Sequence, residues 1–222
     1  MELLDAIKSR HSVRQYQDKA LRTDVLTPLQ REIDACNQES GLHIQLVTNE
    51  PKAFDSLMAH YGKFSGVRNY VALVGKKDAV LQETCGYYGE RIVLKAQQLG
   101  LNTCWVAMTY KKIPSAIQVE NGEKLCLVIA LGYGENQGVS HPVKSREAVT
   151  KNTGAAVPDW FDQGVDAALL APTAMNQQKF KFSLSGNQVS VQAGRGFYSK
   201  IDLGIVKYHF EIGAGTENFV WM

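Results

Sequence analysis

The stretch Ala171-Pro172-Thr173-Ala174-Met175-Asn176-Gln177-Gln178 closes a short apolar segment and runs directly into an alternating segment, residues 179–184. The spacing predicts a helix over residues 158–170 that stops at Ala-Pro, then a loop, then a strand. A helix end of this kind presents backbone N–H groups and side-chain amides at one place. Because a plain hydrophobic core has no need of such donors, we interpret the stretch as a binding loop.

The composition is that of an ordinary globular protein. The 222 residues suffice for one large domain or two small ones, and 45% are hydrophobic and 21% charged. The net charge of +2 is too small for a nucleic-acid surface, so we expect no nucleic-acid partner. No apolar run approaches the ~18 residues of a membrane span, and residues 1–9 lack the apolar core of a signal peptide. We therefore expect no membrane partner and a cytoplasmic location.

Four cysteines, Cys36, Cys85, Cys104 and Cys126, are scattered along the chain without C-x-x-C spacing. This usage is typical of a reducing compartment, and no His/Cys cluster has the spacing of a zinc site. We expect no metal, and we expect histidines such as His209 to lie on the surface or on a helix face.

A second polar stretch, Arg10-His11-Ser12-Val13-Arg14, follows a short amphipathic helix expected over residues 2–9. Alternation places Arg10, Ser12 and Arg14 on one side of an extended or turning backbone. Two guanidiniums with a hydroxyl between them suit a phosphate, because Arg supplies forked donors and a fixed charge. A solvated basic segment after a helix has the same composition, and from spacing alone this plainer interpretation is favoured.

Hydrophobic periodicity predicts mixed helices and strands over the rest of the chain. Helices are expected over residues 27–40, starting at Thr27-Pro28, and over 51–61, 78–99 and 199–213. Strands are expected over residues 42–47, 69–75, 103–108, 125–131, 179–184, 188–192 and 216–221. Residues 135–153 are rich in Gly, Ser, Asn and Lys and predict a linker.

The segments before and after this linker resemble each other weakly in sequence. Gly89 and Gly100 bracket a helix at a spacing of eleven, as do Gly204 and Gly215, and a tryptophan follows within six residues each time. The pattern suggests two related α+β halves, although helix-then-strand units also recur by chance. The binding loop lies in the second half and the Arg stretch in the first, so one shared site is the economical interpretation.

Four motifs together resemble the FMN-dependent nitroreductase family. Its members carry an early Arg-x-Ser-x-Arg, a helix ending in Ala-Pro-Ser-x-x-Asn-x-Gln, a Gly-Leu-x-x-x-Trp after a long helix, and a Lys-x-Arg after a strand ending in Gly-Tyr. The corresponding segments here are Arg10-His11-Ser12-Val13-Arg14, the Ala171–Gln178 stretch, Gly100-Leu101-Asn102-Thr103-Cys104-Trp105, and Gly132-Tyr133 followed by Lys144-Ser145-Arg146.

The order of the motifs departs from the typical pattern, in which the Ala-Pro loop follows the Arg stretch within tens of residues. Typical members are homodimers whose subunits share the FMN sites. The present order resembles the subfamily in which one fused chain mimics the dimer and keeps one FMN site of two. The resemblance therefore implies an α+β nitroreductase-like fold by internal duplication, with related half-domains over residues 1–148 and 155–222. Each half would have a central antiparallel or mixed sheet flanked by helices, and a pseudo-dimer of this kind can be a monomer.

The resemblance also implies roles for individual residues. Arg10 and Arg14 would bind the phosphate of FMN, with His11 and Ser12 alongside. Lys144 and Arg146 would lie on the phosphate or near the pyrimidine and ribityl groups. Residues of the loop would line the isoalloxazine ring, and Asn176 would bond its polar edge. Residues 106–108 occupy the place of a turn whose backbone N–H faces flavin N5, although Ala and Met stand where the family has Gly. The remaining implied flavin contacts are Asn69, Ala107, Met108, Pro172, Thr173, Ala174 and Met175.

The activity implied by the resemblance is oxidoreduction. NADH or NADPH would reduce FMN, and a nitroaromatic, quinone or similar small molecule would reoxidise it in a ping-pong cycle through N5. No side chain is required as a nucleophile, so no catalytic residue is named. Two alternatives stay open: a non-redox FMN carrier or sensor, and a dehalogenase or flavin-fragmenting enzyme on the same fold.

Overall fold

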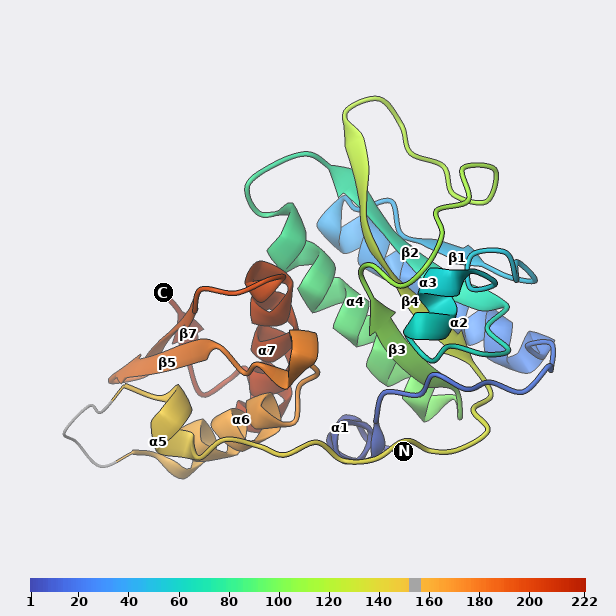
Figure 1. The fold of residues 1–222 in the computed structure, drawn as a ribbon. Coiled ribbons are helices and arrows are strands. Elements are labelled where there is room, and N and C mark those ends of the chain that lie inside the picture. The colour runs from blue at the N-terminus through green and yellow to red at the C-terminus, as the bar shows by residue number, and fades with distance from the viewer. Residues whose placement is uncertain (152–156) are drawn as a thin grey trace. The chain divides into compact units, whose positions relative to one another are not determined.

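The computed structural model describes residues 1–151 and 157–222 of the chain (Figure 1). These residues fold into two compact units. The four-stranded unit consists of Ser9–Leu81 and Arg91–Val139, and the three-stranded unit of Met1–Lys8, Gln82–Glu90 and Ser140–Met222. The expected boundary near residue 155 and the end of the expected linker lie outside the described residues.

The four-stranded unit is built on an antiparallel sheet with strand order β1-β2-β4-β3. Its strands are β1 Gln45–Val47, β2 Asn69–Lys76, β4 Glu123–Gly132 and β3 Asn102–Val106. The central strand β2 is buried except at Lys76, and β4 is buried from Leu127 to Gly132, as their apolar runs predict. The register sets Asn69 opposite Leu131 and Asn102 opposite Gly132, so the Gly-Tyr-Gly turn leaves the sheet beside the start of β3.

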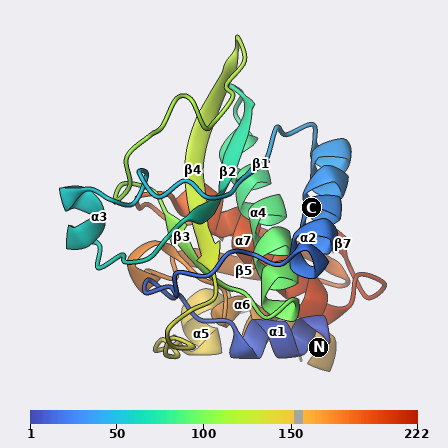
Figure 2. The same cartoon turned by 90° about the vertical axis from the view of Figure 1, so that its right-hand side faces the viewer.

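Helices cover one face of this sheet and a mixed layer covers the other (Figure 2). Helix α2 (Thr23–Ser40) and the second half of α4 (Leu81–Gln98) lie on one side, and α3 (Leu57–Tyr61) lies on the other. Gly41 ends α2 in the left-handed conformation, and Asp78 Oδ1 accepts the N–H of Leu81 at the start of α4.

Two expected helix starts in this unit were wrong. Helix α2 begins at Thr23, and Pro28 lies inside it, because the Arg22 carbonyl already accepts the N–H of Leu26. Helix α3 begins only at Leu57, where Ser56 caps it by accepting the N–H of Ala59. The residues just after Pro51 instead form a turn whose N–H groups bond the Glu50 carboxylate.

The three-stranded unit packs a small sheet against two helices. The hairpin β5 (Phe180–Ser185) and β6 (Gln188–Ala193) is antiparallel, and β7 (Val220–Trp221) pairs with β6 in parallel. Helices α6 (Asp159–Leu169) and α7 (Ser199–Ala214) pack on each other, and α1 (Leu3–Ser9) and α5 (Arg146–Val149) complete the elements. An aromatic cluster forms the core, with Phe182 and Phe210 stacked at 4.7 Å between ring centroids.

His209 is the main surprise in this core, because its expected place was a surface or helix face and it is 0% exposed. Its Nε2 lies 2.8 Å from Oε1 of Glu90, which is also fully buried. Its Nδ1 lies 3.0 Å from the carbonyl oxygen of Ala167. A carbonyl only accepts, so Nδ1 carries a proton, and the contact with Glu90 requires a second proton between Nε2 and Oε1. The imidazole and the carboxyl therefore satisfy each other as a pair.

The α+β class, with antiparallel sheets and flanking helices, is confirmed. The compact units do not coincide with residues 1–148 and 155–222, because Met1–Lys8 and Gln82–Glu90 belong to the three-stranded unit. The internal duplication stays a prediction. Within the described residues, no helix is both long and apolar enough to cross a membrane, and no group of three or more His, Cys, Asp or Glu could hold a metal.

Candidate functional site

The Arg10–Arg14 stretch runs beside β3 in the four-stranded unit. Ser12 forms a parallel bridge with Thr103, and the N–H of Val13 donates to the Thr103 carbonyl at 3.0 Å. The three polar residues differ in exposure. Ser12 and Arg14 are exposed, whereas Arg10 is only 3% exposed. Alternation alone therefore does not describe the surroundings of these side chains, because Arg10 is buried while Ser12 and Arg14 are exposed.

The ionisation of the buried Cys104 thiol is affected by all three of these residues. Burial raises its pKa above the usual value, and the charge of Arg14, a hydrogen bond with Ser12 and the charge of Arg10 oppose that shift. Arg10, Ser12 and Arg14 therefore act together on the ionisation of one buried thiol. Sequence reasoning had treated Cys104 only as a scattered thiol.

Arg14 has the environment of an anion-binding group. Among the described residues its guanidinium makes no recorded ion pair with a carboxylate, and it lies 5.9 Å from the centroid of the Phe64 ring. A positive charge with exposed N–H donors and no carboxylate partner retains its capacity for a phosphate.

Two neighbouring segments shape the surroundings of the Arg stretch. The Gly138 backbone, with φ of 73°, packs so closely on His11 that an added Cβ would lie 2.7 Å from the His11 Cβ. The second segment contains Tyr133, whose carbonyl accepts the N–H of Gln17. The Tyr133 hydroxyl is buried and has no hydrogen-bond partner within the described structure. An orphaned hydroxyl of this kind is compatible with a polar ligand that completes it.

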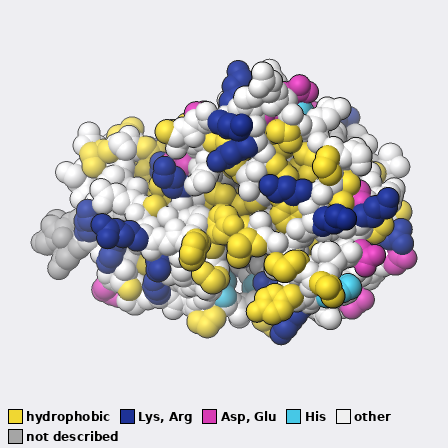
Figure 3. All heavy atoms as spheres, turned by 45° about the horizontal axis from the view of Figure 1, so that its top comes forward, with side chains coloured by type: hydrophobic (Ala, Val, Ile, Leu, Met, Phe, Trp, Pro, Cys, Tyr) yellow, Lys and Arg dark blue, Asp and Glu magenta, His cyan; other side chains and the backbone are white. Residues whose placement is uncertain are grey.

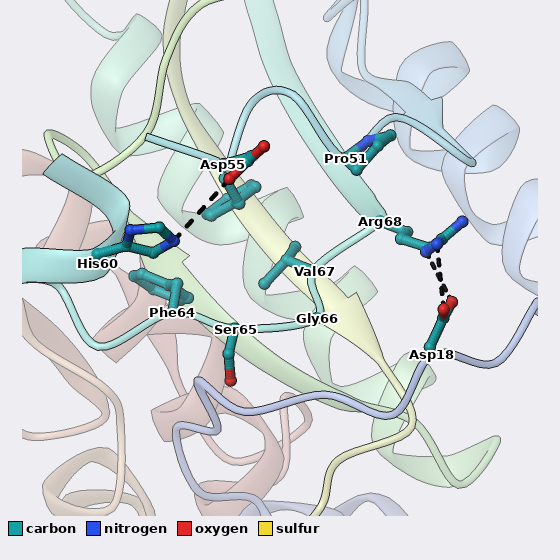
Figure 4. A pocket seen from close by; sticks show the side chains of 10 residues that line it. Asp18, Pro51, Asp55, His60, Phe64, Ser65, Gly66, Val67 and Arg68 are labelled. Atoms are coloured by element: carbon teal, nitrogen blue, oxygen red, sulfur yellow. Dashed lines mark hydrogen bonds and ion pairs between the residues drawn. The ribbon is translucent and has the colours of Figure 1, made fainter. Parts of the chain in front are cut away.

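A pocket lined in part by Phe64 has a volume of about 300 Å³ (Figure 4). Phe54, Phe64 and Val67 form its apolar floor. Its rim is charged, with Arg68 Nε 2.7 Å from Asp18 Oδ1 and His60 Nε2 4.0 Å from Asp55 Oδ1. These charges largely pair with one another, so the pocket is less suited to a phosphate than the Arg stretch is.

The other flavin positions expected in this unit fall at the ends of its strands. Asn69 is buried at the start of β2, and its Oδ1 accepts the N–H of Asn49 at 3.2 Å. Ala107 and Met108 follow β3, and Met108 is 68% exposed. The backbone after β3 therefore reaches the surface where the resemblance implies an N5 contact.

The Ala171–Gln178 loop lies in the three-stranded unit and contains the 3-10 turn η1 (Ala174–Asn176). Its expected spare donors are mostly used inside the unit. The N–H of Ala174 donates to Asp202 at 3.0 Å, and the N–H of Gln178 donates to the Thr173 hydroxyl at 3.1 Å. Pro172, Thr173 and Ala174 are partly exposed and Met175 is 82% exposed. The loop thus offers side-chain surface more than free N–H groups.

Residues 142–144 run along this loop and are hydrogen-bonded to it. The Asn176 side-chain amide donates to the Pro142 carbonyl at 2.9 Å, as does the Gln178 amide. The Lys144 Nζ donates to the carbonyl oxygens of Gln177 and Gln178 at 2.8 and 3.0 Å. The structure therefore binds Lys144 directly to the loop that carries Asn176.

Arg146 points to carboxylates of α6. Its guanidinium lies 2.7 Å from Asp162 and in a bidentate ion pair with Asp166. These carboxylates raise the pKa of Arg146 further above its already high value. A phosphate would compete with them for this side chain.

Asp202 was not singled out from the sequence. It is 5% exposed, and its carboxylate accepts hydrogen bonds from the loop residues Ala174 and Gln177. The signal was present, since an acidic residue interrupts the apolar run Ile201-Asp202-Leu203-Gly204-Ile205-Val206.

The surface around these elements carries mixed charge. On the face drawn in Figure 3, Lys and Arg side chains are dispersed among hydrophobic and neutral ones, with Asp and Glu toward the edges. The exposed large hydrophobic side chains of the four-stranded unit include Leu57, Met58, Tyr61 and Met108.

A protein-family model described as "Putative TM nitroreductase" matches residues 2–214. The chain belongs to this nitroreductase family. The match includes sequence from both units, so the family assignment does not depend on the loop or the Arg stretch alone. No curated protein matches the chain.

Solved structures share the fold at low sequence identity. A nitroreductase structure from Thermotoga maritima is 22% identical with a TM-score of 0.67, covering 96% of this chain and 83% of that one. A Desulfovibrio desulfuricans nitroreductase in complex with FMN is 17% identical with a TM-score of 0.56, covering 71% and 99%. An NADH dehydrogenase/NAD(P)H nitroreductase from Parabacteroides distasonis is 20% identical with a TM-score of 0.53, covering 68% and 97%. At these identities the likeness shows the fold.

Proposed function

We propose that the chain binds FMN and acts as an oxidoreductase that uses NADH or NADPH to reduce a small organic acceptor such as a nitroaromatic or a quinone. The observation that carries the proposal is the Arg10–Ser12–Arg14 group beside β3, in a chain of the nitroreductase family. The FMN complex of the Desulfovibrio desulfuricans neighbour supports the choice of cofactor.

The residues of the four-stranded unit fit the anionic end of FMN. Arg14 would donate to the phosphate from an exposed guanidinium without a carboxylate partner among the described residues, and Ser12 would add a hydroxyl. Buried Arg10 would contribute fixed positive charge, and His11 would border the group. Asn69 and the backbone at Ala107 and Met108 are the proposed contacts for the pyrimidine edge and N5.

The residues of the three-stranded unit fit the ring. Met175, with Pro172, Thr173 and Ala174, offers an exposed surface for the isoalloxazine. Asn176 would approach the polar edge, although its amide already bonds Pro142 and Gln178. Lys144 retains one N–H beyond its two bonds to loop carbonyls. Arg146 would reach a phosphate only by leaving Asp162 and Asp166.

When bound, FMN supplies hydride acceptance and donation at N5, which one pocket can use twice in a ping-pong cycle. The positive charges of Lys144 and Arg146 would stabilise negative charge on the ring or the phosphate. We propose that the chain functions in the cytoplasm without a nucleic-acid partner and that a monomer is sufficient.

Anaerobic reduction tests the proposal directly. Purified protein is reconstituted with FMN, freed of excess flavin, and mixed with NADH or NADPH while the visible flavin absorbance is followed. We expect prompt bleaching by at least one nucleotide and recovery on addition of a quinone. Holoprotein that stays oxidised under an excess of both nucleotides would refute the reductase activity and favour a carrier or sensor. Protein that binds no FMN would refute the proposal as a whole.

A further inference from the structure

Asp202 is a buried carboxylate beneath the Ala171–Gln178 loop. It lies in the first turn of α7, where its Oδ1 accepts the N–H of Ala174 at 3.0 Å. Its Oδ2 accepts a side-chain N–H of Gln177 at 2.6 Å. Hydrogen bonds to a charged acceptor are stronger than neutral ones, particularly away from solvent. The carboxylate therefore ties two points of the loop to a rigid helix.

The two tied points enclose a strained backbone. Met175 and Asn176 have φ of 52° and 53°, and Gln178 has φ of 44°. Asn tolerates this left-handed region, but Met and Gln rarely adopt it. Such conformations persist where surrounding contacts hold them, and they cluster at binding sites. Ala174 and Gln177 lie on either side of Met175 and Asn176, so the Asp202 bonds hold this pair from both ends.

The side chain of Gln177 has only one orientation that satisfies its neighbours. Its Nε2 donates to the Phe197 carbonyl at 2.8 Å as well as to Asp202. Both partners are acceptors, so the NH₂ end of the amide faces them. Replacing one acceptor by a donor would therefore disturb the whole arrangement.

We propose that Asp202 is a positioning residue for flavin binding, which through Ala174 and Gln177 holds residues 174–177 in the conformation that receives the isoalloxazine ring. The inference rests on the proposed binding of FMN. Asp202 makes its bonds beneath the loop and acts on the ring through Met175 and Asn176. The exposed Met175 side chain is the surface that this support presents.

The ionisation of Asp202 gives the inference a pH signature. Burial raises its pKa to about 6, although hydrogen bonds from Gln177 and Ala174 oppose the shift. Helix α4 packs against α7 at Gly204, and its nearby titratable groups are engaged elsewhere, Glu83 with Lys207 and Tyr87 with Glu211.

The fold and the loop respond to this ionisation in opposite directions. Because the folded pKa lies above the unfolded value of about 4, the folded state holds the proton more tightly, and its stability decreases as pH rises from about 4 to about 6. The carboxylate is the stronger acceptor for the loop, so FMN affinity should increase over the same range. A residue with only a structural role would not separate the two trends.

The test compares Asp202→Asn and Asp202→Ala with Glu211→Gln, which removes a carboxylate from the same helix away from the loop. FMN dissociation constants are measured by fluorescence titration at about pH 5 and about pH 7.5, together with Tm. We expect Asp202→Asn to weaken FMN binding roughly tenfold at the higher pH and to leave Tm equal or higher. The variant should lose the part of the pH dependence that Asp202 contributes and keep the part that comes from the FMN phosphate, whose second pKa is about 6. Glu211→Gln should keep the wild-type affinity and pH profile.

An FMN-independent measurement reads the loop itself. In protein without flavin, hydrogen exchange at the Ala174 amide should be faster in Asp202→Asn than in wild type. Wild-type FMN binding combined with an unchanged affinity and pH profile in Asp202→Asn would overturn the inference alone. Failure of the wild type to bind FMN would overturn the proposed function and the inference with it.

Discussion

A substitution of Arg14 is the clearest way to separate an effect on phosphate binding from an effect on the stability of the fold. Its side chain is exposed, and its ring contact with Phe64 is at 5.9 Å, a separation at which an exposed cation–π contact contributes roughly 0.5–1 kcal/mol. A charged hydrogen bond to phosphate contributes about 1.5–3 kcal/mol. Arg14→Ala should therefore weaken FMN binding roughly ten- to a hundredfold while lowering the free energy of unfolding by no more than about 1 kcal/mol.

Riboflavin makes the assay specific, because it has the flavin ring without the phosphate. Titration of protein fluorescence with FMN and with riboflavin should show that Arg14→Ala loses affinity for FMN only. Arg22→Ala is the matched control, since it removes an exposed guanidinium of the same unit whose partner is Asp24. Equal losses for the two flavins would mean that Arg14 supports the ring or the fold, and no loss for either would remove it from the site.

Three further predictions concern the framework that carries the site. Because Glu90 and His209 share one proton in a buried contact, Glu90→Ala should cost about 3–5 kcal/mol of unfolding free energy in urea. Glu90→Gln, which can still donate to Nε2, should cost clearly less, and equal costs would contradict the pairing. Gly204→Ala places a Cβ 2.0 Å from the Glu83 carbonyl oxygen, so it should lower unfolding free energy by about 1–3 kcal/mol, and a neutral effect would show that α4 and α7 pack less closely. Burial raises the pKa of Cys104, so a thiol reagent followed by mass spectrometry should label it more slowly than the less buried Cys126, and equal rates would argue against that burial.

The sequence predicted the strands better than the helix starts, for a physical reason. The apolar run of β2 and the Ser185-Gly186-Asn187 turn between β5 and β6 each leave one arrangement that satisfies both burial and backbone. Thr27-Pro28 has the composition of a helix start, yet α2 begins four residues earlier. A proline near a helix start is compatible with several boundaries, and local composition does not choose among them.

The candidate site divides in the same way. Motif spacing found Arg10, Arg14 and the loop, because these chemistries are written in short stretches of sequence. It missed Asp202, whose role depends on the chain folding back over a separation of 28 residues so that Ala174 reaches it. It did not distinguish buried Arg10 from exposed Arg14, because alternation describes direction along a strand but not which side chain the rest of the chain covers.

Lys144 and Arg146 show why a motif has to be read together with its partners. Lys144 bonds the carbonyl oxygens of Gln177 and Gln178, and removing it would release the loop backbone as well as a charge. Arg146 is engaged with Asp162 and Asp166, but exposed ion pairs contribute only roughly 0.2–1 kcal/mol each. A phosphate that formed charged hydrogen bonds of about 1.5–3 kcal/mol could draw Arg146 away from both carboxylates. Of the two, Arg146 is therefore free to change partners when a flavin binds, and Lys144 serves the loop whether or not a flavin is present.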